Sequence, residues 1–396
     1  MIVIIFGTSL FFTVLFFTLA LKAYRRGMHI WTPTYLGDCI RSGERKDPSE
    51  TIHVMLCIVD HFEPGNGKVD LQRARARVST WLQRYPALAE VHQDSDGRPP
   101  QHTWFFPPHY HQADHLERIV SLCTKGYGEI EMHLHHDHQY PFPETETSLA
   151  EKIERCLKEY AEYGIWGYLN GRRVYAFIHG NWALDNSAGG KYCGVNNELS
   201  ILAATGCYAD FTFPAPNQCQ PKLINRIYYV KDDPNRAKSF STGIPVRVGG
   251  KEWGDLMIIQ GPIGLRWKSK PFMSRLCIET AEIDHTNLPI PSRIDYWVKS
   301  NIHVIGRPNW IFIKLHCHGA PEVNHESLLG EAADRMYSYF ESKYDDGQKY
   351  TLHYVTAREM YNIIKAAEAG EVNSPNQYRD YLITKPTYAP KEGQRR

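Results

Sequence analysis

Short apolar runs alternate with longer amphipathic segments over most of the chain. Runs rich in β-branched and aromatic side chains, such as 51–59 (TIHVMLCIV) and 309–315 (NWIFIKL), predict buried strands. Residues 71–85, 148–163 and 328–344 are instead predicted to be helices, the last two with apolar side chains at helical spacing. The remaining predicted strands are 103–106, 129–135, 173–179, 209–213, 256–260 and 350–355, and the remaining helices are 112–123, 196–205, 293–300 and 357–369. Strands that alternate with helices in this way favour an α/β sheet or barrel built from βαβ units.

The N-terminal segment has a different pattern, because residues 2–21 contain no charged side chain. A helix of that length would rise about 30 Å, the thickness of a bilayer's hydrocarbon core. We therefore expect a transmembrane anchor over residues 1–21, with membrane lipid around it. The alternative is a cleaved signal peptide, which would need a basic start and a shorter apolar core. Lys22, Arg25 and Arg26 follow the segment, and this charge bias favours a single-pass protein whose C-terminal part lies on the cytoplasmic face.

Differences in composition divide the rest of the chain into a connector, a folded unit and a tail. Residues 22–50 are basic and contain Pro and Gly, which predicts a juxtamembrane connector. Residues 51–370 carry the strand–helix alternation and predict one folded unit. Within it, residues 214–275 hold many Pro, Gly, Lys and Arg residues, so we expect an insertion, such as a β-hairpin that shapes the substrate site. Residues 371–396 are polar and contain Pro, which predicts a loose tail.

Charge and composition limit the partners. The net charge is +1, so the chain offers no reason to expect nucleic acid as a partner. The 24 Tyr and nine Trp are many for this length, and amphipathic rings suit sugar faces, although the core is the simpler place for any single ring. Nine cysteines without a dense framework agree with a reducing compartment.

Side chains able to bind a metal gather where the predicted strands end. The C-terminal strand ends form the active face of α/β barrels, so four such groups predict a metal hydrolase. The groups are Asp60-His61, the His133–His138 run, His179-Gly180-Asn181-Trp182 and His316-Cys317-His318.

Spacing within the histidine run leaves two geometries open. On a strand, side chains at i and i+2 share a face, so His133 and His135 can point together. If the chain turns helical after His133, Asp137 at i+4 converges with it instead. Either pair supplies two ligands for Zn²⁺ or a similar divalent ion, and Asp60 or His61 would complete a set of three.

In chain order, these motifs resemble the NodB-homology polysaccharide deacetylases. The resemblance implies a distorted (β/α)7-type barrel and metal-dependent removal of N-acetyl or O-acetyl groups from sugars. It implies that Asp60 is the general base and that His61 replaces the family's metal-binding acid. It makes His133 the first histidine ligand and places Asp137 where the family has its second, with His135 and His138 beside it. The strand end Ile313-Lys314-Leu315-His316 matches the motif whose histidine, here His316, is the general acid.

The resemblance therefore implies a hydrolase of non-peptide carbon–nitrogen bonds, a carbohydrate deacetylase that uses a divalent metal such as zinc. Its substrate would be an acetylated sugar in a glycan or lipid-linked glycan, within polysaccharide or exopolysaccharide biosynthesis machinery of the cell envelope. The alternative is a barrel without catalysis that serves as a glycan-binding or assembly subunit. A metal phosphoesterase would need more carboxylates and a phosphate-binding cation at the same face.

Overall fold

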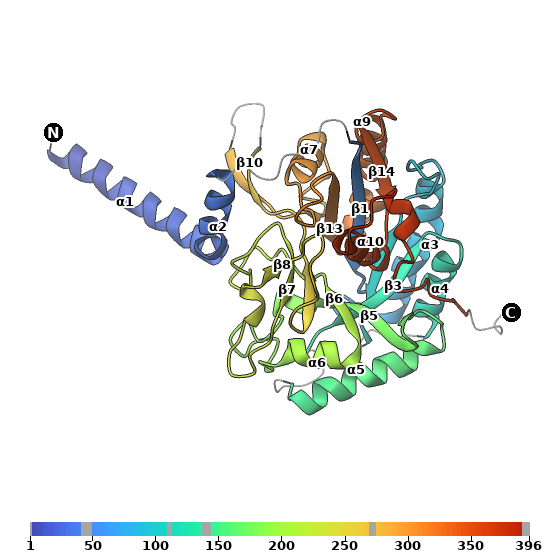
Figure 1. Ribbon diagram of the computed structural model, residues 1–396. Helices are drawn as coiled ribbons and strands as arrows, with labels where there is room; N and C mark the ends of the chain where they lie inside the picture. Colours follow the sequence, from blue (N-terminus) through green and yellow to red (C-terminus); the bar gives the residue numbers. More distant parts are fainter. Residues whose placement is uncertain (1, 41–49, 109–112, 137–143, 269–274, 390–396) are drawn as a thin grey trace.

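The computed structural model describes residues 2–40, 50–108, 113–136, 144–268 and 275–389 (Figure 1). Its centre is one large sheet in which seven neighbouring strands run parallel. In order across the sheet these are β13 (Trp310–Cys317), β1 (Ile52–His61), β2 (His102–Phe106), β3 (Gly128–Leu134), β5 (Arg172–His179), β6 (Cys207–Asp210) and β9 (Leu256–Ile259). The predicted α/β class is confirmed.

Shorter strands extend this parallel core. Two antiparallel strands continue it beyond β9, and another strand flanks β13 at the opposite edge. No strand pairing among the described residues closes the sheet into a barrel. The added strands are β7 (Ile227–Val230), β8 (Ile244–Pro245) and β12 (Glu282–Ile283), while β14 (Tyr350–Tyr354) pairs with β1 and β4 (Gly167–Leu169) with β5.

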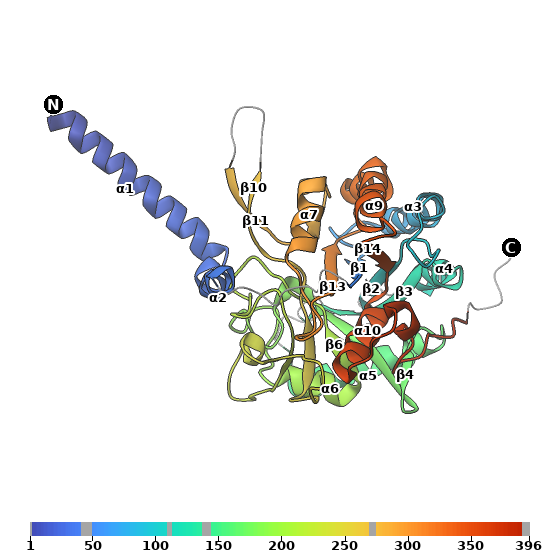
Figure 2. The same cartoon turned by 45° about the horizontal axis from the view of Figure 1, so that its top comes forward.

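Helices pack on both faces of the strands because side chains alternate along each strand. On β1, Leu56 and Ile58 pack among the residues of the helices that follow the parallel strands, whereas Cys57 and Val59 pack with α10 (Ala357–Ala369). Figures 1 and 2 show the helices arranged around the sheet. The other helices of the body are α3 (Leu71–Ala89), α4 (Ala113–Thr124), α5 (Glu146–Ala161), α6 (Glu198–Thr205), α7 (Pro291–Lys299), α8 (His325–Leu329) and α9 (Glu331–Tyr344).

The parallel strands end at one edge of the sheet, which brings the predicted polar groups together. His61, His179 and Cys317 are the last residues of β1, β5 and β13, and β3 ends one residue before His135. The strand ends named from the sequence therefore do lie at one edge of the sheet, and whether this edge is an active site stays a prediction.

The expectation of a transmembrane anchor is wrong. The apolar N-terminal segment does form a helix, α1 (Ile2–Arg25), which extends away from the body (Figures 1 and 2). A bilayer-crossing helix needs about 20 consecutive, predominantly apolar residues. Within the described part of the chain, no helix meets both the length and the hydropathy that a crossing requires. The predicted single-pass location and its cytoplasmic orientation are overturned with the anchor.

The segment after α1 packs onto the region expected to be an insertion. In α2 (Met28–Ile40), Trp31 is fully buried against Ile224 and Ile263. Asp38 accepts a hydrogen bond from Arg226 at 2.7 Å. Residues 214–275 also contribute β7, β8 and β9 to the main sheet, and a separate hairpin of β10 (Gly264–Lys268) and β11 (Arg275–Glu279) begins there.

The C-terminal segment is not loose over its described part. Arg379 and Ile383 are buried, and the backbone amide of Ala389 donates to the carbonyl of Tyr163 at 3.0 Å. A short 3₁₀ helix covers Pro375–Tyr378. Polar composition suggested a tail in solvent, but its charges are used in buried ion pairs.

Candidate metal centre

A carboxylate and two imidazoles converge at the C-terminal edge of the sheet. Glu63 follows β1, His133 lies on β3, and His135 follows β3 directly. Glu63 Oε1 is 2.8 Å from His135 Nε2 and 3.8 Å from His133 Nε2. One ligand atom from each residue lies within 4.8 Å of the others. We call Glu63, His133 and His135 the metal triad.

The metal triad opens onto a cavity of about 350 Å³. His61 and His318 stack in its wall with ring centroids 4.7 Å apart, and His61 also packs edge-on against His133 at 4.7 Å. The indole of Trp182 lies 6.2 Å from the ring of His318. The remaining lining residues are Glu63, Asn66, Gly67, Lys68, His135 and Asn181.

Backbone and amide groups orient both triad imidazoles. His133 Nδ1 lies 2.9 Å from the carbonyl oxygen of Ile178, so it carries the proton and donates it there. The lone pair of His133 Nε2 therefore faces the triad, and this atom makes no hydrogen bond among the described residues. His135 Nδ1 is held at 3.1 Å by the side-chain amide of Asn181. Such partners behind the ring are what fix metal-binding histidines.

The turn after β5 shapes this arrangement. A Cβ at Gly180 would lie 2.5 Å from atoms of the His135 ring, so only glycine leaves room for that imidazole. Asn181 and Trp182 both adopt positive φ, at 57° and 55°. Such backbone strain persists where the surrounding structure enforces it, often at functional sites. The turn thereby places Asn181 on His135 and Trp182 in the cavity wall.

Charge in the site favours an ionised carboxylate. Burial opposes ionisation of Glu63, but its polar interactions with His133 and His135 outweigh burial and hold the pKa of Glu63 well below its ordinary value. Burial, followed by the neighbouring charges of His318, His133 and His316, holds the pKa of His61 well below its ordinary value. His61 is therefore a neutral imidazole near neutral pH.

Asp60, the predicted general base, does not join the cavity. It lies one residue from His61 and so projects to the opposite face of β1. Its Oδ1 accepts from the backbone amide of Gly319 at 2.6 Å, and its Oδ2 lies 3.0 Å from His102 Nε2. A Cβ at Gly319 would lie 2.1 Å from Asp60 Oδ2, so the glycine permits this contact. Asp60 holds the chain that follows β13.

His316, the predicted general acid, is buried and does not line the cavity. It is 2% exposed, and neither ring nitrogen makes a hydrogen bond among the described residues. Burial first, then the charge of Lys314, lowers its pKa well below the ordinary value. The other predicted ligands, Asp137 and its neighbour His138, lie outside the described residues.

The metal triad fits a divalent cation. Two imidazoles and one carboxylate are a set that zinc accepts in catalytic sites, leaving positions for water and substrate, and that non-haem iron also accepts. The oriented lone pair of His133 and the ionised Glu63 are both ready to bind such an ion. The predicted ligands His133 and His135 belong to the set, whereas His61 lies beside it.

Sequence reasoning missed Glu63, Asn181 and His318 as parts of the site. The signal for Glu63 was present, because His61 and Glu63 are two residues apart and extended chain places such side chains on one face. Asn181 and His318 stand in strand-end groups that the sequence pointed to, but it gave them no role, since their positions depend on turns that follow β5 and β13.

Comparisons with known proteins add little. No family model matches this chain, and no curated protein matches it either. Among solved structures, the chain is similar to the 4-alpha-glucanotransferase from Thermococcus litoralis, with 12% identity and a TM-score of 0.35. The match covers 78% of this chain and 38% of that enzyme's chain, so this chain spans well under half of that enzyme's length. A likeness this weak carries no argument about activity, and the resemblance to the deacetylases stays a prediction.

Proposed function

We propose that this protein is a metal-dependent hydrolase that removes the acetyl group from an acetylated sugar of a glycan. The observation that carries the proposal is the metal triad, a buried carboxylate and two oriented imidazoles at the edge of a cavity large enough for a sugar unit. The substrate class comes from the order of the strand-end motifs, and the Trp182 ring in the cavity wall suits a sugar face.

Glu63, His133 and His135 would hold the ion. A divalent ion bound there would lower the pKa of a water molecule and polarise the acyl oxygen. His61 and His318, in the cavity wall, lie where one imidazole can accept the proton of the attacking water. The other can deliver a proton to the departing nitrogen as the carbon–nitrogen bond breaks, which yields acetate and a free amine. We assign these steps to His61 and His318 rather than to Asp60 and His316, because only the former line the cavity.

A distorted (β/α)7 barrel, as in the deacetylase family, is part of the same proposal. Seven parallel strands from β13 to β9 agree with it in number and order. Two close approaches, between β13 and the segments that follow β6 and β9, support it further. A Cβ on Gly261, which follows β9, would lie 2.3 Å from the carbonyl oxygen of Lys314 on β13, and Lys314 Nζ donates to the carbonyl of Phe211 after β6 at 2.8 Å.

The test is acetate release by the full chain, loaded with Zn²⁺, from oligomers of N-acetylglucosamine. We expect release by the wild type and a loss of at least about 100-fold in Glu63→Gln, which keeps the shape but removes the charge of the triad. Glu151→Gln changes an exposed glutamate on α5 and should retain full activity. His61→Gln and His318→Gln should lower the rate while Zn²⁺ affinity persists, since these rings would move protons and hold no ion.

A wild type that binds both Zn²⁺ and the oligomers but releases no acetate would overturn the enzymatic proposal. That result would favour the glycan-binding or assembly subunit. Loss of activity in Asp60→Asn at unchanged folding stability would overturn the assignment of the base to the cavity wall.

A further inference from the structure

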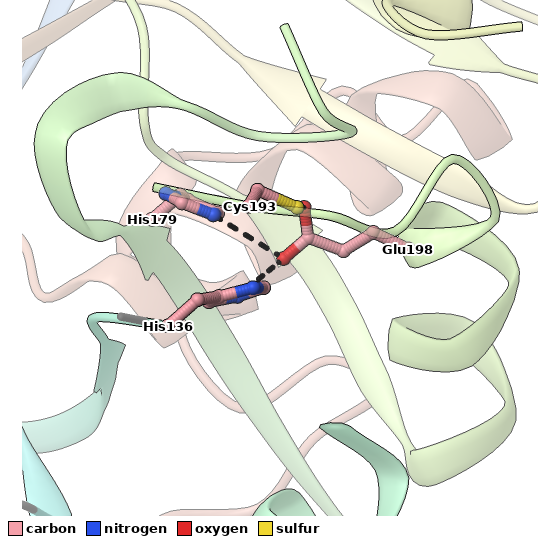
Figure 3. Close-up of side chains that lie close together, drawn as sticks. All are labelled: His136, His179, Cys193 and Glu198. Carbon is pink, nitrogen blue, oxygen red and sulfur yellow. Dashed lines mark hydrogen bonds and ion pairs between the residues drawn. The ribbon is translucent and has the colours of Figure 1, made fainter. Parts of the chain in front are cut away.

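A second cluster of potential ligands lies behind the metal triad. His135 and His136 are adjacent, but only His135 belongs to the triad, while His136 lies against Glu198 (Figure 3). His179, the last residue of β5, and Cys193, in the segment before α6, complete the group. The four residues come from four separate places in the chain, and Glu198 is the first residue of α6.

The four side chains present their ligand atoms to one point. One atom from each lies within 4.8 Å of the other three. Glu198 Oε1 is 2.9 Å from His136 Nε2 and 3.6 Å from His179 Nε2, and Cys193 Sγ is 3.5 Å from Glu198 Oε2. Ligands around a tetrahedral zinc ion lie about 3.3–3.8 Å apart, given bonds of about 2.0–2.3 Å. Small movements would therefore bring all four within bonding distance of one ion.

Burial makes a simple hydrogen-bonded cluster a poor explanation. All four residues are at most 1% exposed. Among the described residues, Glu198 forms ion pairs with no Lys or Arg, only with the two histidines. Its Oε2 accepts from the backbone amide of Asp185 at 2.6 Å, but a buried carboxyl group with no cation beside it is still costly to ionise. A bound divalent ion would supply the missing positive charge.

His179 is oriented as a ligand. His179 Nδ1 donates to the backbone carbonyl of Gly180, which leaves the Nε2 lone pair directed at the cluster. That Nε2 atom makes no hydrogen bond among the described residues. The same arrangement of a carbonyl behind the ring orients His133 in the metal triad.

We propose that His136, His179, Cys193 and Glu198 form a structural Zn²⁺ site. A set of four protein ligands leaves no open position, which distinguishes a structural from a catalytic zinc site. Binding would release the thiol proton of Cys193 to solvent, since the thiolate is the ligand. The ion would join the segment after β3, the end of β5 and the start of α6. It would thereby brace the turn that holds Asn181 and Trp182 in the neighbouring cavity, and the site does not depend on the proposed hydrolase activity.

Cobalt substitution separates this site from the metal triad, because only this site contains a thiol. The full chain is stripped with chelator and titrated with Co²⁺ alone. We expect a thiolate-to-cobalt charge-transfer band in the near ultraviolet in the wild type and in Glu63→Gln, where the triad is disabled. The band should vanish in Cys193→Ser and persist in Cys219→Ser, which alters another buried cysteine outside the cluster. Absence of the band in the wild type, or its persistence in Cys193→Ser, would overturn the proposal.

Stability gives a second readout, which compares the wild type with two folded variants. Adding Zn²⁺ to the metal-free wild type should raise its melting temperature, because the ion binds the folded state alone. The rise should persist in Glu63→Gln and be lost, or reduced to the part that the triad supplies, in Glu198→Gln. Equal rises in the wild type and Glu198→Gln, together with no loss of zinc content in Glu198→Gln, would contradict a site at this cluster. If Glu63→Gln alone removed all bound zinc, the triad would be the sole site and the inference would fail.

Discussion

Gly180 shows how one missing methyl group positions a ligand. A Cβ on residue 180 would lie only 2.5–2.7 Å from three atoms of the His135 ring. We expect Gly180→Ala to displace the imidazole and weaken Zn²⁺ binding at the metal triad by about tenfold or more. Titration of the metal-free protein with a competing chromophoric chelator measures this. Gly37→Ala is the matched control, since nothing lies within 4 Å of a Cβ there. Equal affinities in the two variants would contradict the packing argument.

The buried carboxylate of Asp60 should act on stability rather than on metal binding. Replacing Asp60 with Asn keeps one oxygen for the Gly319 amide but removes the charge that faces His102. We expect a loss of about 1–3 kcal/mol in the free energy of unfolding, the usual cost of a damaged buried hydrogen bond. Zn²⁺ affinity should be unchanged. Urea unfolding and zinc titration on the same sample check both parts, and a normal stability with weakened zinc binding would reverse our assignment.

The relative placement of side chains could be predicted on strands, where residues alternate between two faces, but not in turns, whose backbone conformation decides where a side chain points. Alternation placed His133 and His135 together, as observed. The same rule separates Asp60 from His61, yet the resemblance to a family motif outweighed it. Asn181 reaches His135 only because its backbone is left-handed, and single-sequence patterns do not specify such a conformation for asparagine in advance.

At the scale of elements, the first and last strands meet through two stacked histidines. His53 on β1 and His353 on β14 have ring centroids 5.2 Å apart, and His53 Nδ1 is 2.9 Å from His353 Nε2. Burial, and then the charge of His353, lowers the pKa of His53 to about 4. Protonation of the His53 ring should therefore weaken the packing between β1 and β14.

The pH dependence of stability should show this pairing. Between pH 6.5 and 4, the unfolded chain binds a proton at His53 and the folded chain does not, so acid favours unfolding in that window. His53→Phe keeps a stacking ring without the titration. We expect the stability advantage of the wild type over this variant to fall by up to roughly 3 kcal/mol from pH 7 to pH 4, measured by urea unfolding. His29→Phe, at an exposed site on α2, controls for the added ring. The same pH dependence of stability in the wild type and in His53→Phe would contradict this prediction.

Most helices and strands were predictable because the spacing of apolar residues differs between the two kinds of element. The strands and helices of the α/β core lie within a few residues of their predicted ranges. The predicted helix 328–344 is divided at Gly330, where the carboxylate of Glu326 occupies the place of a Cβ and accepts from the amide of Glu331. A local polar contact of this kind leaves no trace in hydrophobic periodicity.

At the scale of the whole molecule, the segment after α10 completes a buried charge cluster. Arg379 pairs with Asp96 at 2.8 Å, Glu359 at 3.2 Å and Asp94 at 3.4 Å, and it donates to the carbonyl of Tyr354 at 2.7 Å. Composition could not predict this, because polar side chains are equally typical of a solvated tail. The same limit applies to the expected anchor. The uncharged run at residues 2–21 suggested a bilayer crossing, but no described helix has the length and hydropathy that a crossing requires.

Removing that charge should destabilise the whole fold. We expect Arg379→Met to lower the free energy of unfolding by about 3–5 kcal/mol, because it leaves the buried Asp94 without its cation and removes one partner each from Asp96 and Glu359. Lys385→Ala, at an exposed position of the same segment, should change it by less than about 0.5 kcal/mol. Chemical denaturation of both variants measures the difference, and similar midpoints would mean that the tail is dispensable.

Arg379 also ties a late segment of the chain to an early one. It is synthesised after every strand that the structure describes, yet it neutralises Asp94 and Asp96, which are synthesised soon after β1. A sheet that forms before Arg379 is in place lacks this cation beside Asp94 and Asp96, although His353 Nδ1 still contacts Asp96 at 2.7 Å. A chain truncated before residue 379 should therefore be less stable than the wild type, for the same reason that Arg379→Met is expected to be.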